Sequence, residues 1–459
     1  MIRTLTVAAM LTLLGAPWAT AQFPAGKQGS SNLHVLAHLP LGGWFGTAEL
    51  ELEEELSRPY AYVSRWAPPG GVYGVDIISV KDPSRPQKLY SWAIDKHELH
   101  QGHGAITNVY FKHKGRYYDV QGFQFRGGSP DEDLGAVVID VTGLPDTSRI
   151  REAGRIRTPD TPGGFHNIFA YKHSDGSTLL VATVQSNPRL PHGANVYDMG
   201  RFLAGDADQG LIARIPLPEP RGANAGYHDI HLAYDPATGQ DRFYGGGPEV
   251  TPTGGYYIYN VTNIREPKLL ASVVGAAGQT GAHTFIPTPD GRYLLTASPV
   301  ERSPMRIFDM QPALSGQSQS VNITRPLGAW TANWQNLPHD FEMRWPYVFA
   351  STYEDGLWVV NIMDPTNPYT VGYYDTYDGP GRQTIVPRYS GTPFNGAWSV
   401  DVRNSDGLIV IADERTGFWT FRMDGFSGWN GAQWGVPNIS SVQDWDNGPD
   451  GAPKPTKVS

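Results

Sequence analysis

The stretch PHDFEMRWPYVFASTYEDGLWVVNIMDPTNPYTVGYYDT, residues 338–376, contains four short apolar segments separated by turn residues. DFEMR, YVFAST, LWVVNI and YTVGYY have the alternation and the β-branched and aromatic residues that are typical of β-strands. The Asp-Gly and Asp-Pro pairs between them favour tight reversals of the chain. Four antiparallel strands in about forty residues are typical of one blade of a β-propeller. The stretch therefore predicts a propeller blade.

The same order of strand, Asp/Asn and Pro turn, and strand recurs in DIISVKDPSRPQKLYSWAI, AVVIDVTGLPDTSRIREAGRI and YYIYNVTNIREPKLLASVV. Proline favours the turn and cannot donate a hydrogen bond into a sheet, which explains its place between strands. The start of the first strand can be aligned seven times, at intervals of 55 to 62 residues: Ala48, Ile106, His166, His228, His283, His339 and Trp398. Such a repeat predicts an all-β fold, a single seven-bladed β-propeller.

The seventh unit contains three clear strands, and its fourth strand is expected from NLHVLAHLP near the N-terminus. An N-terminal strand in this place would close the ring and remove exposed sheet edges. We therefore expect a signal peptide at 1–21, the propeller at 22–426 and a C-terminal tail at 427–459. The tail is rich in Gly, Trp, Asn and Pro and is expected to wrap the propeller or to be partly disordered.

GLWVVNIMDPTNP resembles the LVIVD repeat of secreted bacterial β-propeller proteins, and NVTNIREP and SVKDPSRP are weaker copies. The resemblance covers most of the mature chain as architecture and is closest in the blade at 339–376. It implies a fold more firmly than an activity.

The first residues, MIRTLTVAAMLTLLGAPWATAQ, have a basic residue, a short apolar run and small residues in an AxA arrangement. They predict a cleaved signal peptide and hence a secreted or periplasmic protein, with a retained N-terminal anchor as the alternative. The apolar run is shorter than the about 20 residues that span a bilayer, and no later stretch is a candidate. We therefore expect no transmembrane segment.

The net charge and the lack of cysteine limit the partners and the kinds of site that can be expected. Without Arg3, the one charged residue of the signal, the chain has 35 basic and 45 acidic residues, a formal charge of −10. Nucleic acid is therefore not an expected partner. The absence of cysteine excludes disulfides, thiolate catalysis and cysteine-ligated zinc. A small-molecule substrate or ligand is expected, and the sequence leaves the oligomeric state open.

Histidine occupies four of the seven aligned positions. With 13 histidines in 459 residues, fewer than one is expected there by chance. The first strand of a blade borders the central channel, so these imidazoles are expected to converge. We predict an axial metal site made by four consecutive blades: His166, His228, His283 and His339. Imidazole favours copper or iron, with zinc as a further candidate, over calcium and magnesium. The alternatives are structural histidines tied by hydrogen bonds and a ligand pocket without metal.

Further residues near these positions are additional candidates. Asn167, Asp229, Thr284 and Asp340 follow the four histidines and could fix their tautomers, most plausibly across blades because neighbours on a strand face opposite ways. His231 and Glu342 lie three residues beyond His228 and His339. His231 is expected to pack, and Glu342 to accept a proton or to pair with an arginine of a neighbouring blade. Trp398 holds the equivalent place in the last blade. His97, His100 and His103 in DKHELHQGHG are expected on the same face, and His103 is the strongest candidate ligand among them.

A four-histidine centre in a propeller is similar to two known families. Selenium-binding protein/methanethiol oxidase binds copper through histidines near its axis, and carotenoid oxygenases hold iron with four histidines. The resemblance is architectural and implies an oxidase or oxygenase type of oxidoreductase; the cysteine motif of selenium-binding proteins is absent, and no substrate is carried over. We expect a small organic substrate. Two alternatives remain open: a non-catalytic secreted binding or scaffold propeller, and a metal-assisted polysaccharide lyase or hydrolase.

Overall fold

The computed structural model describes residues 29–449 apart from short gaps. The gaps are 43–45, 67–71, 101–103, 125–129, 185–192, 219–225, 249–253, 280, 301, 315–318, 378–394 and 437–442. The signal peptide predicted at 1–21 and the candidate ligand His103 lie outside the described residues. Within the described ranges, no helix has the length and apolar character needed to cross a membrane.

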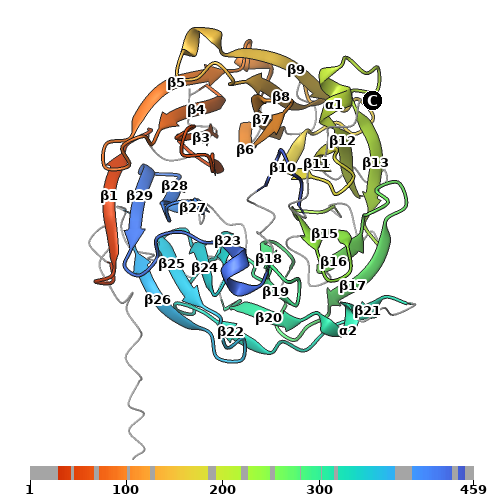
Figure 1. The fold of residues 1–459 in the computed structure, drawn as a ribbon, viewed down its shortest axis with the longest axis vertical. Coiled ribbons are helices and arrows are strands. Elements are labelled where there is room, and N and C mark those ends of the chain that lie inside the picture. Colours follow the sequence, from red (N-terminus) through yellow and green to blue (C-terminus); the bar gives the residue numbers. More distant parts are fainter. Residues whose placement is uncertain are drawn as a thin grey trace, which may run out of the picture.

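The described strands form seven sheets around a central axis, as Figure 1 shows. The innermost strand of each sheet contacts that of the next, and the last contacts the first, so the ring is closed. These innermost strands are β2 (Leu50–Leu52), β6 (Gly104–His113), β10 (Phe165–Lys172), β14 (Asp229–Asp235), β18 (Phe285–Pro287), β23 (Asp340–Arg344) and β27 (Ala397–Val402). The prediction of an all-β seven-bladed propeller is confirmed.

Each sheet continues outward through antiparallel neighbours. The second strands are β3 (Tyr60–Arg65), β7 (Arg116–Gln124), β11 (Thr178–Val184), β15 (Gln240–Gly247), β19 (Tyr293–Thr296), β24 (Tyr347–Ser351) and β28 (Ile409–Asp413). The third strands are β4 (Gly74–Ser79), β8 (Leu134–Asp140), β12 (Gly193–Asp198), β16 (Gly255–Asn260), β20 (Met305–Asp309), β25 (Leu357–Asn361) and β29 (Gly417–Met423). The outermost strands are β5 (Gln87–Ala93), β9 (Arg151–Arg157), β13 (Leu211–Pro216), β17 (Lys268–Val274), β22 (Gly328–Trp330), β26 (Tyr369–Tyr374) and β1 (Leu33–Leu39).

Short elements lie between or beside the blades. β21 (Val321–Asn322) adds a parallel edge to β17. The described helices are single turns: η1 (His97–Leu99), η2 (Thr147–Arg149), α1 (Met199–Leu203), α2 (Gln311–Leu314) and η3 (Gly431–Trp434).

The N-terminal strand closes the ring. β1 pairs antiparallel with β29, from Leu33 opposite Met423 to Leu39 opposite Phe418. β1 therefore completes the sheet β27-β28-β29 as its outermost strand, which confirms the closure predicted from NLHVLAHLP. Since β29 is paired on both sides, it presents no open edge to solvent.

The Asp-Pro turns are stabilised by the aspartate itself. The Asp364 carboxylate accepts hydrogen bonds from the backbone N–H (2.9 Å) and the hydroxyl (2.7 Å) of Thr366. Asp82 makes the same two bonds with Ser84, at 3.1 and 2.6 Å. These side chains imitate a backbone turn, which explains why the D-P-S/T-x-P pattern separates third and fourth strands.

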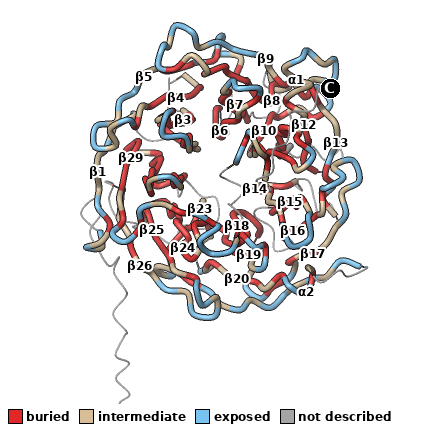
Figure 2. The backbone as a smooth tube through the Cα atoms, in the orientation of Figure 1, coloured by how far each residue is buried: buried red, intermediate tan, exposed pale blue. Residues whose placement is uncertain are grey.

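Apolar side chains fill the space between neighbouring sheets, and Figure 2 shows buried inner strands surrounded by a largely exposed outer rim. In the blade at 339–376, Phe349, Val359 and Val360 are fully buried, whereas Tyr369 on the outermost strand is 53% exposed. Burying a side chain of this size stabilises the fold by about 1.5 to 3 kcal/mol. The packed sheets thus hold the inner strands, and the residues at their starts, in fixed positions around the axis.

Candidate metal centre

The four candidate histidines lie where innermost strands of four consecutive blades begin. His166 is the second residue of β10, and His228 and His339 directly precede β14 and β23. Both of these residues still donate their backbone N–H to the neighbouring second strand, His228 to Gly246 (2.7 Å) and His339 to Ser351 (2.9 Å). The blade sheets therefore position their Cα atoms.

The prediction that the first strand of this blade starts at His283 is wrong. β18 begins at Phe285, two residues later. One backbone hydrogen bond, from Ala297 N–H to the Thr284 carbonyl (2.8 Å), ties this segment to the next strand. A single bond does not make a regular ladder, so the strand starts later although His283 still lies at the channel mouth.

The four imidazole rings form a continuous arc. The ring centres of His166 and His228 are 4.0 Å apart, those of His228 and His283 3.9 Å, and those of His283 and His339 4.9 Å. With metal–nitrogen bonds of about 2.1 Å, imidazoles in neighbouring coordination positions have ring centres about 4 to 5 Å apart. Each neighbouring pair of rings is therefore close enough for its two members to bind the same transition-metal ion.

Each ring turns its Nδ1 atom toward an oxygen atom. His166 Nδ1 lies 2.8 Å from the side-chain oxygen of Gln124, the last residue of β7. His339 Nδ1 lies 2.7 Å from the backbone carbonyl of Trp398. A carbonyl oxygen can only accept a hydrogen bond, so Nδ1 carries the proton in both rings and Nε2 carries the lone pair.

His283 follows the same pattern. The Thr284 hydroxyl donates to the backbone carbonyl of His339 and therefore accepts, at 2.6 Å, from His283 Nδ1. His228 Nδ1 lies 3.5 Å from a carboxylate oxygen of Asp229. This is an electrostatic contact and not a hydrogen bond, so hydrogen bonds fix the Nδ1–H tautomer in three of the four rings, those of His166, His283 and His339. Metal-binding histidines commonly donate their second ring N–H in this way.

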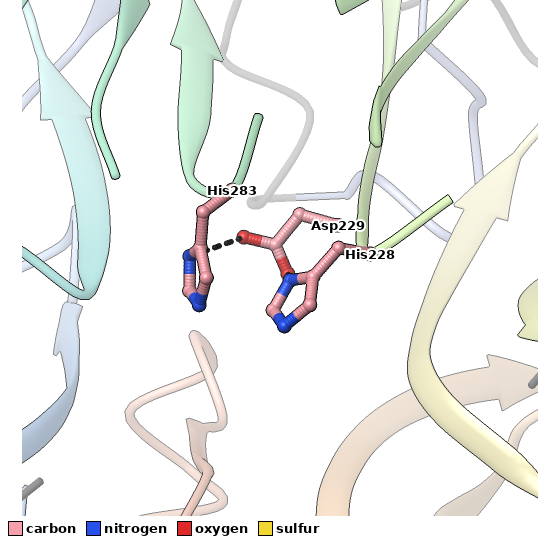
Figure 3. Close-up of side chains that lie close together, drawn as sticks. All are labelled: His228, Asp229 and His283. Atoms are coloured by element: carbon pink, nitrogen blue, oxygen red, sulfur yellow. Dashed lines mark ion pairs between the residues drawn. The ribbon is translucent and has the colours of Figure 1, made fainter. Parts of the chain in front are cut away.

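Asp229 lies between two of the rings. Its carboxylate is 3.8 Å from His283 Nδ1 as well as 3.5 Å from His228 Nδ1, and it accepts a hydrogen bond from Asn167 Nδ2 at 2.7 Å. Figure 3 shows the two imidazoles side by side with this carboxylate between them. Asp229 thus faces two histidines: His228, which precedes it in the chain, and His283 of the next blade. The sequence predicts that it serves a histidine of another blade, and it faces one of each kind.

Among the described residues, His228, Asp229 and His283 form the one group of three metal-ligating side chains with donor atoms all within 4.8 Å of one another. Two histidines and a carboxylate are also a known ligand set for non-haem iron. As the side chains lie, this group of three meets the distance limit, and no described group that includes His166 or His339 does; binding by four imidazoles requires the rings to turn toward one ion.

Two of the rings are held neutral by their surroundings. Burial, reinforced by the neighbouring imidazoles, lowers the pKa of His283 well below its usual range. Burial also lowers the pKa of His339, to about 4, against the opposing effect of Asp229. Neutral imidazole is the form that binds a metal ion, so both residues keep their lone pairs at neutral pH.

The remaining part of the channel mouth is apolar. The equivalent positions in the other three blades are Ala48, Ile106 and Trp398, all buried. They form one apolar cluster together with Trp66, Leu337 and Tyr353. The Trp398 ring lies 4.0 Å from that of His339 and 4.7 Å from that of Trp66. The histidine arc therefore faces a wall of aromatic and aliphatic side chains.

Below the arc, toward the other face of the propeller, the axis contains a cavity of about 110 Å³. Asp229, Thr284 and His339 reach it from the histidine side. The other polar groups in its lining are mostly carboxyl and amide groups: Glu49, Glu51, Asn108, Asn167, Asp340, Glu342 and Asp401.

Three additional candidates lie on this cavity and away from the rings of the arc. Asp340 accepts from the Ser399 hydroxyl at 3.0 Å, and burial raises its pKa to about 7. Glu342 accepts from Arg344 of its own strand, and not from an arginine of a neighbouring blade as expected. His231 packs 4.8 Å from the Phe169 ring, and burial lowers its pKa to about 3.

The two described histidines of DKHELHQGHG, His97 and His100, lie in different environments. His100 is buried, and its Nε2 lies 2.6 Å from the carboxylate of Asp131. His97 belongs to η1 and is exposed. Neither has a contact with the histidine arc among the described residues.

The sequence did not identify Gln124 as part of the site. It comes from the second strand of the preceding blade, and no repeat position or motif marks it. Trp398 was a candidate by alignment, yet it contributes its backbone carbonyl, which any residue at this position would provide. No protein-family model matches the chain, and a search of curated proteins finds no match.

Proposed function

We propose that this protein is an exported LVIVD-type β-propeller metalloprotein that binds one copper or iron ion through the Nε2 atoms of His166, His228, His283 and His339. We further propose that it is an oxidoreductase, of the oxidase or oxygenase type, acting on a small organic substrate. The observation that carries the proposal is the arc of four neighbouring imidazoles, three of which make a hydrogen bond through Nδ1 to an accepting oxygen, while the Nδ1 of His228 faces the Asp229 carboxylate at 3.5 Å.

Structural histidines, the alternative explanation, account less well for the contacts of the four rings. The Nδ1 hydrogen bonds of the arc go to different kinds of group, a side-chain amide, a hydroxyl and a backbone carbonyl, and so do not repeat one strand-to-strand bond from blade to blade. The lowered pKa values of His283 and His339 disfavour protonation of these two rings. Neutral imidazole is the form that binds a transition-metal ion.

The protein's own residues would shape the reaction space. If the four imidazoles held a redox metal, it would supply oxidase or oxygenase chemistry toward dioxygen and substrate. The cluster of Trp66, Tyr353 and Trp398 excludes water from one side of the arc and offers an apolar surface to the substrate. Gln124 keeps His166 in the required tautomer and orientation, and the Asp229 carboxylate faces the Nδ1 atoms of His228 and His283.

The direct test is elemental analysis of protein purified without an affinity tag, before and after incubation with Cu²⁺, Fe²⁺ or Zn²⁺. We expect about one equivalent of copper or iron per chain, and for a redox ion a visible or paramagnetic spectrum. Protein that contains no metal and takes up none of the three ions would leave the non-catalytic binding propeller as the better description.

Replacement of Asp229 distinguishes the two donor sets. If the carboxylate serves as an acceptor for His228 and His283, Asp229→Asn keeps an accepting oxygen and should lower metal affinity by about 10-fold, the lower end of the range for such partners. If Asp229 is itself a ligand, Asn should abolish binding. Competition with a chelator of known affinity measures the difference, and Asp340→Asn, which replaces a carboxyl not in contact with the rings, is the matched control.

A further inference from the structure

The cavity below the histidine arc is covered on its far side by the C-terminal segment. Residues 443–449 are described, and Gln443 and Trp445 form part of the cavity lining. Trp445 is 9% exposed and belongs to the same apolar cluster as residues of the second blade. Its ring packs at a T-shaped angle, 6.3 Å from that of Tyr110. The segment therefore crosses the end of the central channel that lies opposite the histidines.

The segment has a compact shape of its own. The Asp444 carboxylate accepts from the backbone N–H groups of Asp446 (3.2 Å) and Asn447 (2.9 Å) and from the Asn447 side chain (2.9 Å). The backbone N–H of Gly448 donates to the Asp444 carbonyl at 2.8 Å. These bonds close a tight turn that presents Trp445 to the propeller.

Side chains alone hold this turn on the blades. The Lys112 ammonium lies 2.6 Å from the Asp446 carboxylate, and the backbone N–H of Lys172 donates to the Gln443 side chain at 3.1 Å. Within the described residues, no backbone–backbone hydrogen bond joins 443–449 to a blade. Contacts of this kind are the first to open in a folded protein, because they can break without disturbing a sheet.

The packing under the turn is incomplete. A second hollow of about 210 Å³ lies between the turn and the bottom of the first two blades. Tyr110, Gln443 and Trp445 border both this hollow and the axial cavity. Trp445 therefore separates the axial cavity from the outer hollow, and movement of this one side chain would connect them.

We propose that residues 443–449 are a removable plug of the axial cavity and that Trp445 is its seal. In the closed position the plug blocks entry of small molecules from this face. When it leaves, the cavity opens to solvent, and the inner side of the histidine arc becomes reachable past Asp229, Thr284 and His339. The proposal depends on the cavity and the turn, and it holds whether or not the arc binds a metal.

The chain contains no cysteine, so a single introduced thiol can report on access to the cavity. Val109 lines the cavity on β6 and is replaced by cysteine, which is slightly smaller. The reaction rate of Val109→Cys with a small methanethiosulfonate reagent is measured in three forms: the full chain, the chain ending at 442, and the full chain with Trp445→Ala. We expect about 30-fold or faster labelling in both opened forms, because the thiol reacts only when the reagent reaches it.

Two controls define the result. Trp445→Phe keeps an aromatic seal and should label almost as slowly as the full chain, and Ser84→Cys on an exposed turn should label at the same rate in every form. Equal rates at residue 109 in the full and opened forms would overturn the proposal. A chain ending at 442 that cannot fold would also overturn it, since the segment would then be part of the scaffold and not a removable plug.

Discussion

The His228→Ala/His283→Ala variant is expected to bind its metal ion at least about 1,000-fold more weakly than the parent protein and to remain folded. Loss of a single hydrogen-bonding partner of a ligand already costs about 10- to 100-fold in affinity, so loss of two direct ligands should cost more. Both residues belong to the group whose donor atoms lie within 4.8 Å of one another. The expected loss therefore holds for either donor set.

The propeller should survive this change because both side chains lie at strand starts. The backbone N–H of His228, which alanine retains, makes the bond to Gly246. His231→Ala is the matched control: it also removes a buried imidazole near the axis, but one that packs on Phe169 away from the arc. It should lower stability and keep the metal.

Elemental analysis, chelator competition and circular dichroism of the parent, the double variant and His231→Ala test this prediction. A chelator should also lower the melting temperature of the parent, since a ligand at 100 times its Kd stabilises the folded state by about 2.7 kcal/mol, and leave that of the double variant unchanged. Equal metal content in parent and double variant would show that the ion binds elsewhere. Similar destabilisation by both variants, with no metal in any of the proteins, would support packed histidines in a binding propeller.

The architecture was predictable because each blade repeats the same local rules. Alternating strands, Asp-Pro turns and a spacing of 55 to 62 residues are all visible in one sequence. Even the closing strand β1 could be assigned, because the last unit lacked one strand and the N-terminal segment resembled outermost strands elsewhere. The start of β18 was placed too early, since hydrophobic alternation does not reveal whether the ladder hydrogen bonds are formed.

The site was predictable only in part. The repeat register placed four histidines at the axis, and the ring distances of 3.9 to 4.9 Å confirm that these side chains lie together. The partners of their Nδ1 atoms depend on contacts between different blades and, for His339, on a backbone carbonyl. Such contacts have no signature in a single sequence. The same is true of the docked turn at Trp445, which the composition of the tail did not reveal.

A second large effect is expected on stability. Asp119, on β7, is fully buried, and burial raises the pKa of its carboxyl to about 8. One carboxyl oxygen is 3.4 Å from Asn108 Nδ2, and the other has no hydrogen-bond partner among the described residues. Glu53 adds to the upward shift through its charge, and Glu51 and Tyr62 also interact electrostatically with Asp119. The carboxyl is therefore protonated in the folded protein at neutral pH.

The direction of the pH dependence follows from this shift. In the unfolded chain the pKa of aspartic acid is about 3.9, so unfolding between pH 4 and 8 releases the Asp119 proton. The stabilising contribution is complete below the unfolded pKa and is lost as the pH rises toward the folded pKa. The loss amounts to about 1.4 kcal/mol per pH unit for one group, or about 2 kcal/mol between pH 6.5 and 8.

The range from pH 6.5 to 8 is chosen because the buried histidines also change the stability, mainly at lower pH. The pKa values of His231 and His339 are lowered to about 3 and about 4, so their contributions rise with pH below the pKa of unfolded histidine, about 6.5. Above pH 6.5 these contributions level off as unfolded histidine loses its remaining protons. A decline in stability between pH 6.5 and 8 then comes from groups whose pKa is raised in the folded protein. They are buried carboxyl groups such as Asp119, Glu54 and Asp401, with pKa values raised to about 8, 8 and 7, and His173, whose pKa is raised, against the effect of burial, by its hydrogen bond to Asp175 and the charge of Asp241.

Asp119→Asn isolates one of these contributions. The amide has the shape of the protonated carboxyl but cannot ionise, so the fall in the free energy of unfolding between pH 6.5 and 8 should become smaller by about 2 kcal/mol. Urea denaturation at four pH values measures the slopes of parent and variant. Asp82→Asn, at an exposed turn where hydrogen bonds from Ser84 lower the aspartate pKa, should leave the slope unchanged in this window. If parent and Asp119→Asn had equal slopes, the carboxyl would be ionised in the folded protein, and the second blade would have to supply a cation or water that stabilises the charge.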